Sequence, residues 1–226
     1  MNASICIEEF CDSLDDIAAF RDIKTSAGLE INAAALAVTG FTRRDWQHAT
    51  RDDFIQRLAF SIRPEYLAAV SAADAAARNG KTSTYKIKQQ NYKGHLIQLS
   101  ANVQPVYSST HKKKVIAAFS RCSYAQSTPE QLIARYESYF SNDSPAFYMP
   151  WLVDQLGIAQ YFITTPTLAA LKWLIYSDYR ISRVQLAEKL GCSIDMLGYY
   201  AQKIKNGLRA GYELNSVREH LRTKTK

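Results

Sequence analysis

The stretch from Arg183 to Gln202 constrains this chain most, because its residues favour a helix, a sharp turn and a second helix. Apolar residues recur at helical spacing before Gly191, and a glycine supplies the backbone freedom that a tight turn needs. Ser193 is a good N-cap for the second helix. Five residues are expected to form the core and turn of this unit: Leu186, Ala187, Leu190, Gly191 and Leu197.

This order of residues resembles the helix-turn-helix of LuxR-type transcription regulators. Thr165-Pro166 is similar to the threonine-proline that opens that domain, and Leu190-Gly191-Cys192-Ser193 is similar to its turn. The resemblance implies an all-α domain over residues 165–226, with a recognition helix from about Ser193 to Leu208 in the major groove of double-stranded DNA. An ordinary helical hairpin within a core is the alternative, because a match over about twenty residues has limited specificity.

Side chains of the expected recognition helix divide into two groups. Gln202 can bond adenine through two hydrogen bonds, and Lys203 can approach guanine. The candidates for base contact are Asp195, Met196, Tyr199, Gln202 and Lys203. The candidates for phosphate contact are Arg183, Lys189, Lys205 and Arg209. Ser216 with Glu219 is expected to cap a last helix, Val217 to about Arg222, and the resemblance implies that this helix pairs two subunits.

Charge points to the same region. From Leu168 to Lys226 there are 11 Lys plus Arg against 5 Asp plus Glu, so this segment holds +6 of the net charge of +7. A local excess of this kind favours a polyanionic partner, whereas evenly spread charge would favour only solubility. A solvated surface with a basic tail is the plainer explanation for part of it.

The N-terminal half carries a second informative stretch, Ile17 to Trp46. It indicates a strand, a turn at Ser26-Ala27-Gly28, a return strand at Leu29 to Ile31, and short helices capped by Asn32, by Thr42 with Asp45, and by Thr50 with Asp53. This stretch resembles PAS domains, with Asn32, Ala33, Gly40 and Phe41 at matching places.

The residues that follow extend the PAS resemblance. Pro64 to Arg78 predicts a long helix, and alternating residues predict strands at Thr82–Gln89, His95–Val106 and Lys114–Cys122. The expected order is β-β-α-α-α-β-β-β over residues 15–123. The fold class is therefore α+β: an N-terminal PAS-like antiparallel sheet with helices, followed by an all-α helix-turn-helix domain.

Cofactors are not expected. Haem-binding PAS domains place a histidine on the long helix, where this chain has none, and the cysteines fall outside the region that flavin-binding members use. A small apolar ligand in the PAS-like core stays open, as does a filled core that serves as a dimer or partner surface. Cys6, Cys11, Cys122 and Cys192 are expected to be reduced thiols, with no metal site.

Residues 124–164 are expected to form a helical connector. Thr128-Pro129-Glu130-Gln131 is a helix start, and Leu132, Ile133, Tyr136 and Phe140 form an apolar stripe. Residues 141–150 are expected to be a loop by composition, followed by a short apolar helix that ends at Gly157. The connector is too apolar for a free linker, so docking between domains or a dimer contact is expected.

Taken together, these features predict a cytoplasmic, sequence-specific DNA-binding transcription regulator, dimeric, with a PAS-like domain for sensing or dimerisation. No run of residues is apolar enough to span a bilayer, and no catalytic constellation supports an enzyme. The alternative is a regulator that sequesters a partner or touches RNA polymerase without reading DNA. The architecture also resembles regulators of plasmid conjugative-transfer operons.

Overall fold

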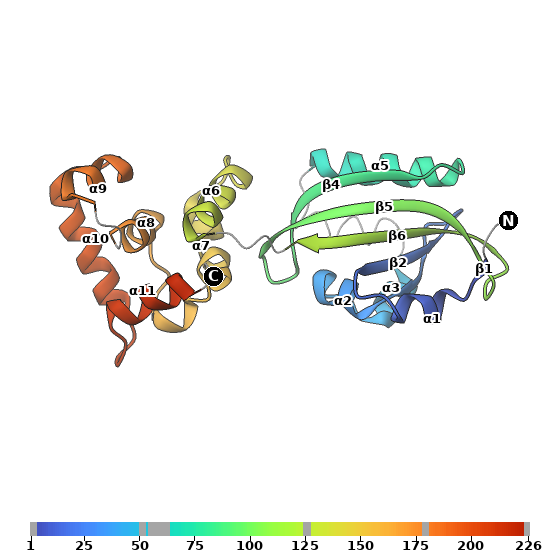
Figure 1. The fold of residues 1–226 in the computed structure, drawn as a ribbon, viewed down its shortest axis with the longest axis horizontal. Helices are drawn as coiled ribbons and strands as arrows, with labels where there is room; N and C mark the ends of the chain where they lie inside the picture. The colour runs from blue at the N-terminus through green and yellow to red at the C-terminus, as the bar shows by residue number, and fades with distance from the viewer. Residues whose placement is uncertain (1–3, 50–52, 54–63, 124–127, 178–180, 224–226) are drawn as a thin grey trace. The chain divides into compact units, whose positions relative to one another are not determined.

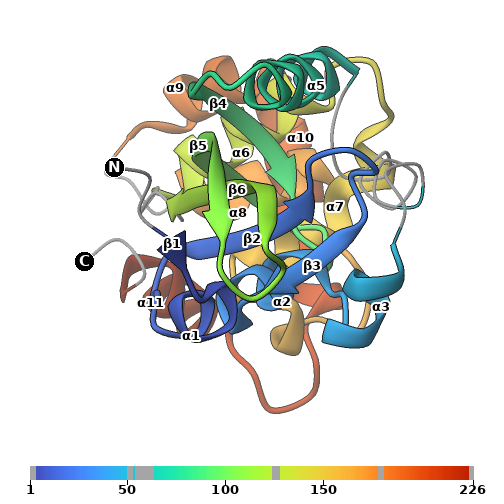
Figure 2. The ribbon, with the colours of Figure 1, turned by 90° about the vertical axis from the view of Figure 1, so that its right-hand side faces the viewer.

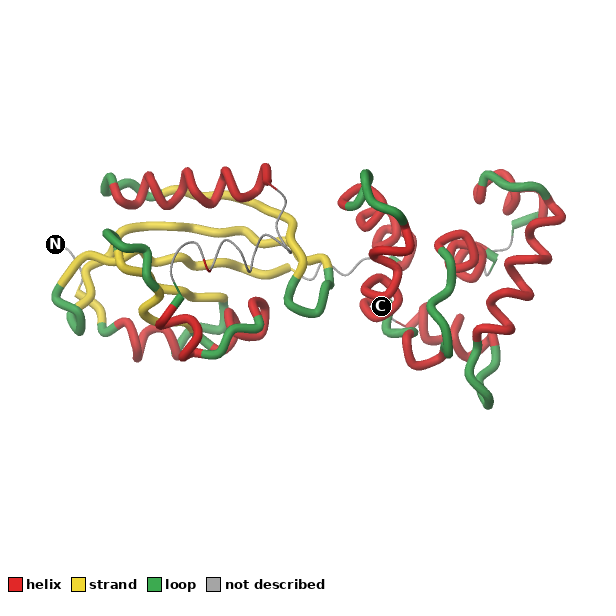
Figure 3. The backbone as a smooth tube through the Cα atoms, turned by 180° about the vertical axis from the view of Figure 1, so that it is seen from behind, coloured by secondary structure: helices red, strands yellow, loops and turns green. Residues whose placement is uncertain are grey.

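The computed structural model describes residues 4–49, 53, 64–123, 128–177 and 181–223, and it divides the chain into two compact units, Met1–Ala125 and Gln126–Lys226. The segment expected to be a separate connector belongs with the C-terminal helices. In Figure 3 the strands, drawn in yellow, lie in the N-terminal unit, while the described part of the C-terminal unit is built from helices and loops. The capping pair expected at Thr50 and Asp53 lies outside the fully described residues.

The N-terminal unit is an antiparallel sheet with helices on both faces (Figure 1). Its strands follow the order β3-β2-β6-β5-β4, and a short parallel strand β1 continues the outer edge of β5. The strands are β1 Ser4–Ile5, β2 Ile17–Asp22, β3 Gly28–Ile31, β4 Ser83–Gln90, β5 Leu96–Ser108 and β6 Lys113–Ser123. The helices are α1 Ile7–Asp12, α2 Ala33–Thr39, α3 Arg43–His48 and α5 Pro64–Arg78.

This order confirms the predicted α+β class and the PAS-like arrangement of the N-terminal half. Strand alternation sends Ile17 and Ala19 to one face, where they pack with α2, α3 and α5, and sends Ala18 and Phe20 to the other, where they pack with α1. The pair β1 and α1 lies before the predicted domain start at residue 15 and was not expected.

Asn32 caps a helix and also forms hydrogen bonds to distant parts of the chain. Its Oδ1 accepts from the backbone N–H of Ala35, which is the predicted N-cap bond, and also from the N–H of Ala18 in β2. Its amide donates to the carbonyl oxygens of Leu14 and Asp16. One buried side chain therefore joins α2, β2 and the loop before β2. The capping box of Thr42 and Asp45 is present as predicted.

The C-terminal unit is a helical array centred on α8. Its elements are α6 Pro129–Tyr139, α7 Pro145–Gln155, the 3-10 turn η1 Ala159–Tyr161, α8 Leu168–Tyr176, α9 Arg183–Leu190, α10 Ile194–Gly207 and α11 Leu214–Thr223. Leu171 and Leu174 of α8 are fully buried, and α8 packs against α6, α7, α9, α10 and α11. The predicted capping box of Thr128 and Gln131 is present at α6.

Two boundary predictions in this unit were wrong. Helix α7 starts at Pro145, inside the expected loop, because a proline fits the first helical turn, and Pro150 sits within the helix where it removes a single backbone hydrogen bond. Helix α11 starts at Leu214, so Ser216 lies inside it. The N–H of Ser216 already bonds the carbonyl of Glu213, which makes a cap there unnecessary.

Candidate nucleic-acid interface

The turn between α9 and α10 has the glycine geometry that its sequence predicts, but Ser193, which stands at the N-cap position of α10, makes no side-chain capping hydrogen bond. Gly191 ends α9 in the left-handed region at φ 61°. The N–H of Cys192 bonds the carbonyl of Ala187 at 3.0 Å, which closes the helix end. A Cβ at Gly191 would meet no atom within 4 Å, so backbone conformation and not crowding accounts for the glycine.

The predicted core residues take three different positions. Leu186, Ala187 and Leu197 are buried, and they hold α9 and α10 against each other and against α8. Leu190 is half-buried at the end of α9, and Gly191 is exposed in the turn. The two helices are thus fixed to the rest of the unit through one apolar side, which leaves the opposite side of α10 to solvent.

Helix α10 is amphipathic, with Leu197 and Ile204 buried. Its opposite face carries every residue predicted for base contact, and all are exposed: Asp195, Met196, Tyr199, Gln202 and Lys203. Tyr199 is 54% exposed, a large value for an aromatic side chain. Spacings of three and four residues bring these side chains onto one side of the helix, so the structure gathers them as a single surface.

Two contacts order this surface. The Nζ of Lys203 lies 5.6 Å from the centre of the Tyr199 ring, within cation-π range. The amide nitrogen of Gln202 donates to the side-chain oxygen of Asn206 at 2.7 Å. Asn206 was missed in the sequence analysis, although its position four residues after Gln202 is the spacing at which side chains on a helix meet.

The residues predicted for phosphate contact are all exposed. Arg183 begins α9, and Lys205 lies near the end of α10. The Nζ of Lys189 lies 4.5 Å from the centre of the Tyr176 ring. Arg209 differs, because its Nε donates to the carbonyl of Phe162 at 3.0 Å. That bond gives Arg209 a structural role at the end of α10.

A short backbone pairing fixes the end of α10. The N–H of Ile163 donates to the carbonyl of Gly207 at 2.8 Å, and the N–H of Arg209 donates to the carbonyl of Tyr161 at 2.9 Å. A bridge between Phe162 and Leu208 lies between these bonds. We call this pairing of residues 161–163 with 207–209 the clamp, and it joins α10 to the segment that follows α7.

Charge is distributed unevenly within the C-terminal unit. Residues 126–167 hold one cation, Arg135, and four carboxylates, Glu130, Glu137, Asp143 and Asp154. From Arg183 to Arg209 the balance reverses, with five cations against Glu188 and Asp195. Lys172 of α8 pairs with Glu137 of α6 at 2.7 Å. The basic excess predicted for the C-terminal region therefore belongs to residues 168–226 and not to the whole unit, because residues 126–167 are net acidic.

The N-terminal unit holds a cavity of about 80 Å³ between its sheet and helices. Apolar side chains such as Ile31 and Val38 line it together with Arg21, Tyr85 and Gln89. Burial, the largest cause, raises the pKa of Tyr85 to about 12, so its hydroxyl stays protonated at neutral pH. A cavity of this volume among the described residues has room for a few waters or a very small molecule.

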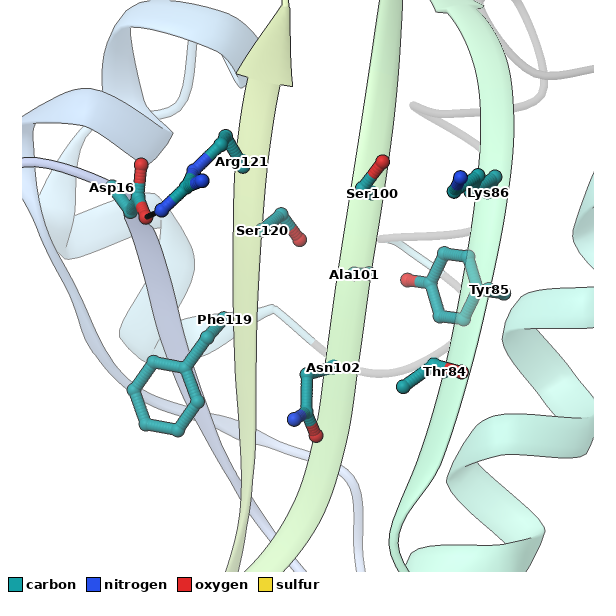
Figure 4. A pocket seen from close by; sticks show the side chains of 10 residues that line it. All are labelled: Asp16, Thr84, Tyr85, Lys86, Ser100, Ala101, Asn102, Phe119, Ser120 and Arg121. Atoms are coloured by element: carbon teal, nitrogen blue, oxygen red, sulfur yellow. Dashed lines mark hydrogen bonds and ion pairs between the residues drawn. The ribbon is translucent and has the colours of Figure 1, made fainter.

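A wider, open depression of about 680 Å³ lies on the opposite face of the same sheet. Figure 4 shows Thr84 and Lys86 on β4, Ser100 and Asn102 on β5, and Arg121 on β6, with Arg121 paired to Asp16 at 3.4 Å. Most of the residues that line it have polar side chains, and it begins where the apolar contacts of α1 with Phe119 end. Among the described residues, no cluster of His, Cys, Asp or Glu has the arrangement of a metal site.

Comparison with known proteins yields partial structural likenesses. No protein-family model matches the chain, and no curated protein matches it. The PAS-B domain of Drosophila melanogaster Cycle with bound glycerol is 14% identical over 47% of this chain and 99% of its own, with a TM-score of 0.35. A PAS domain from Colwellia psychrerythraea is 13% identical over 50% of this chain and 90% of its own, with a TM-score of 0.38.

A third solved structure is a domain of a putative light and redox sensing histidine kinase from Haloarcula marismortui, 16% identical over 50% of this chain and 94% of its own, with a TM-score of 0.35. These likenesses are too weak to carry a functional inference. The element order and sheet pairing define the N-terminal half as PAS-like. Within the described residues, no helix has the length and apolar character needed to cross a membrane.

Proposed function

We propose that this protein is a sequence-specific DNA-binding transcription regulator whose α10 enters the major groove. The single observation that carries the proposal is the exposed face of α10, where Tyr199, Gln202 and Lys203 stand together on a helix anchored by its other side. The major groove of B-DNA is about 12 Å wide and admits one α-helix. Helix α10 suits that role because its buried face packs against the rest of the unit and its exposed face carries polar and aromatic side chains.

Each group on this face has a chemical partner on DNA. The side-chain amide of Gln202 can donate to N7 of adenine and accept from its exocyclic N6 amine. Lys203 can donate to O6 or N7 of guanine. Arg183, Lys189 and Lys205 are exposed on α9 and α10, and contacts of such cations with phosphates would position the helix without reading sequence. Asp195 lies in the first turn of α10, where a carboxylate also stabilises the helix dipole.

The remaining parts of the proposal concern assembly. A homodimer would place two copies of α10 at half-sites about one duplex turn apart. The PAS-like unit would supply the dimer contact or respond to a small molecule bound in its 80 Å³ cavity. Contact with RNA polymerase would follow DNA binding.

The test is a fluorescence-anisotropy titration with promoter fragments at two salt concentrations. The variant Lys203→Glu/Lys205→Glu reverses two exposed charges of α10, and Lys86→Glu/Lys88→Glu reverses two exposed charges on β4 as a matched control. We expect tight binding that weakens with salt, loss of binding in the α10 variant, and retention in the control. Equal binding by all three proteins, with circular dichroism confirming their fold, would refute the proposal.

A protein-interaction regulator is the second candidate, and one observation favours it. Phe147 of α7 is 56% exposed, and its ring packs edge-on against the ring of Trp151 with the two ring centres 5.1 Å apart. Together the two rings form an aromatic surface on α7. Exposed aromatic clusters are typical of protein interfaces. If duplex binding is absent and Phe147→Ser abolishes capture of a defined partner, this second function replaces the first.

A further inference from the structure

One end of the N-terminal sheet collects cations from three separate segments. The end of β2 pairs with the start of β6 through Asp22 and Val115, and Arg78 at the end of α5 donates to Ser26 in the β2–β3 turn. These contacts bring the turn, the end of α5 and the β5–β6 hairpin to the same end of the sheet, which Figure 2 views face-on. We call the following set the basic end: Lys24, Arg78, Lys81, Lys112, Lys113 and Lys114.

Carboxylates offset only part of this charge. Asp22 accepts from Lys113 at 2.5 Å and from the backbone N–H groups of Lys24 and Thr25 at 2.8 Å. Burial opposes ionisation of Asp22, yet these hydrogen bonds hold its pKa well below the usual range. Glu8 is engaged by the hydroxyl of Thr110 at 2.7 Å, and Glu9 follows it in the first turn of α1. Six cations thus face three carboxylates among the described residues at this end.

The hairpin that carries the lysines is structurally defined. Ser108 and Lys113 are paired across it, and the Oγ of Ser108 accepts from the N–H of His111 at 3.1 Å. Lys112 adopts a positive φ of 47° at the tip, which reverses the chain. In the described part of the chain, no salt bridge joins Lys112 or Lys114 to a carboxylate. Their ammonium groups are therefore presented from a fixed turn, which lowers the entropy lost when they bind.

We propose that the basic end is a second contact for the phosphate backbone of DNA, beyond the base-reading face of α10. The identity of the polyanion rests on the proposed function. Lysine ammonium and hydroxyl groups are common phosphate ligands, and the tip residues Ser109, Thr110, His111 and Lys112 are all polar. Surfaces that bind lipid combine basic residues with inserted apolar ones, whereas the four tip residues are polar and the nearest exposed aromatic, Tyr107, lies within β5, paired with Lys114. DNA held by α10 raises the local phosphate concentration, so a weak second contact suffices.

The experiment measures binding of the full chain to a mixed-sequence duplex several helical turns long, over a series of salt concentrations. The test variant is Lys112→Glu/Lys114→Glu, and Lys86→Glu/Lys88→Glu is the control with the same change in net charge. Loss of two phosphate contacts should lower the slope of log K against log salt by about 2 and the affinity roughly tenfold. The control should change neither quantity by a comparable amount.

The outcomes separate the two proposals. If the wild-type chain does not bind any duplex, the proposed function itself fails, and the second contact fails with it. If the wild-type chain binds and the α10 variant does not, while the Lys112 and Lys114 variant keeps the wild-type slope, only the second contact is overturned. A loss shared equally by the test and control variants would also overturn it, because the effect would then come from net charge. Unfolding midpoints verify that each variant is folded.

Discussion

Arg21 of β2 and Asp74 of α5 form a bidentate pair inside the N-terminal unit, with Nη1 to Oδ2 at 2.7 Å and Nη2 to Oδ1 at 2.5 Å. Both side chains are almost completely buried. The pair ties the long helix to the sheet beside the cavity that Arg21 also lines. Removal of one partner would leave the other charge buried without its counter-ion.

We therefore expect Asp74→Ala to lower the free energy of unfolding by about 3 to 5 kcal/mol. The double variant Arg21→Met/Asp74→Leu should lose much less, because it buries no unpaired charge. Urea titrations followed by circular dichroism measure both changes. A double variant that is as unstable as Asp74→Ala would show that the pair stabilises the fold through more than mutual charge compensation.

The pair of Asp22 and Lys113 predicts a pH dependence. The pKa of Asp22 is lowered in the folded protein, so the pair stabilises the fold above the unfolded-state pKa, near 4, and this contribution is lost as the pH falls below that value. Asp22→Asn should therefore destabilise the protein at pH 7 and matter progressively less below pH 4. Unfolding curves at several pH values provide the measurement, and a constant difference across the range would contradict the prediction.

Gly191 and Gly198 predict opposite effects of the same substitution. Gly191→Ala forces a side chain into the left-handed region and should cost about 1 kcal/mol or more. Gly198 lies within α10, where an added Cβ meets no atom within 4 Å, so Gly198→Ala should stabilise the protein by about 0.5 to 1 kcal/mol. Thermal unfolding of the two variants provides the comparison. A destabilised Gly198→Ala would contradict the assigned environment of that position.

Gly198→Ala also probes the proposed DNA interface, because a variant that folds more stably and yet binds more weakly separates the two effects. A methyl group on the exposed side of α10 should weaken DNA binding only if the backbone approaches the duplex closely there. Anisotropy titrations at matched salt report this, with Ala201→Ser, at a half-buried position of the same helix, as the control.

Gln202 and Asn206 predict a specificity effect. Gln202→Ala should cost about 1 to 3 kcal/mol at one base pair of the binding site and little elsewhere. Asn206→Ala removes the bond that orients Gln202, so it should weaken discrimination at the same base pair by a smaller amount. Competition with duplexes altered one position at a time measures both. Uniform weakening across all duplexes would assign these residues to the phosphate backbone instead.

Local signals in the sequence predicted local structure well. Asn32, the Thr42 and Asp45 pair, and the Thr128 and Gln131 pair each begin the helix that they were expected to begin. These predictions succeed because a capping side chain bonds atoms only two or three residues away. The exposed face of α10 follows in the same way from helical periodicity.

Contacts between residues far apart in the chain could not be predicted from the sequence. Arg21 and Asp74 are 53 residues apart, and only the packing of α5 on the sheet brings them together. Arg209 carried the charge of a phosphate contact, yet the fold places the carbonyl of Phe162 beside its Nε. The start of α7 was missed because Pro145 and Pro150 suit a loop by composition, and burial of Tyr148 and Leu152 outweighs that preference.

The clamp between residues 161–163 and 207–209 couples the end of α10 to the segment that follows α7. Two backbone hydrogen bonds and the Arg209 side chain hold the last turn of α10 to the chain that leaves α7, so neither part can tilt without carrying the other. The clamp is therefore a direct covalent and hydrogen-bonded route from α7 to the helix that carries Tyr199 and Gln202. If α10 reads DNA as proposed, binding of a partner at the aromatic surface of α7 would change how α10 lies in the groove.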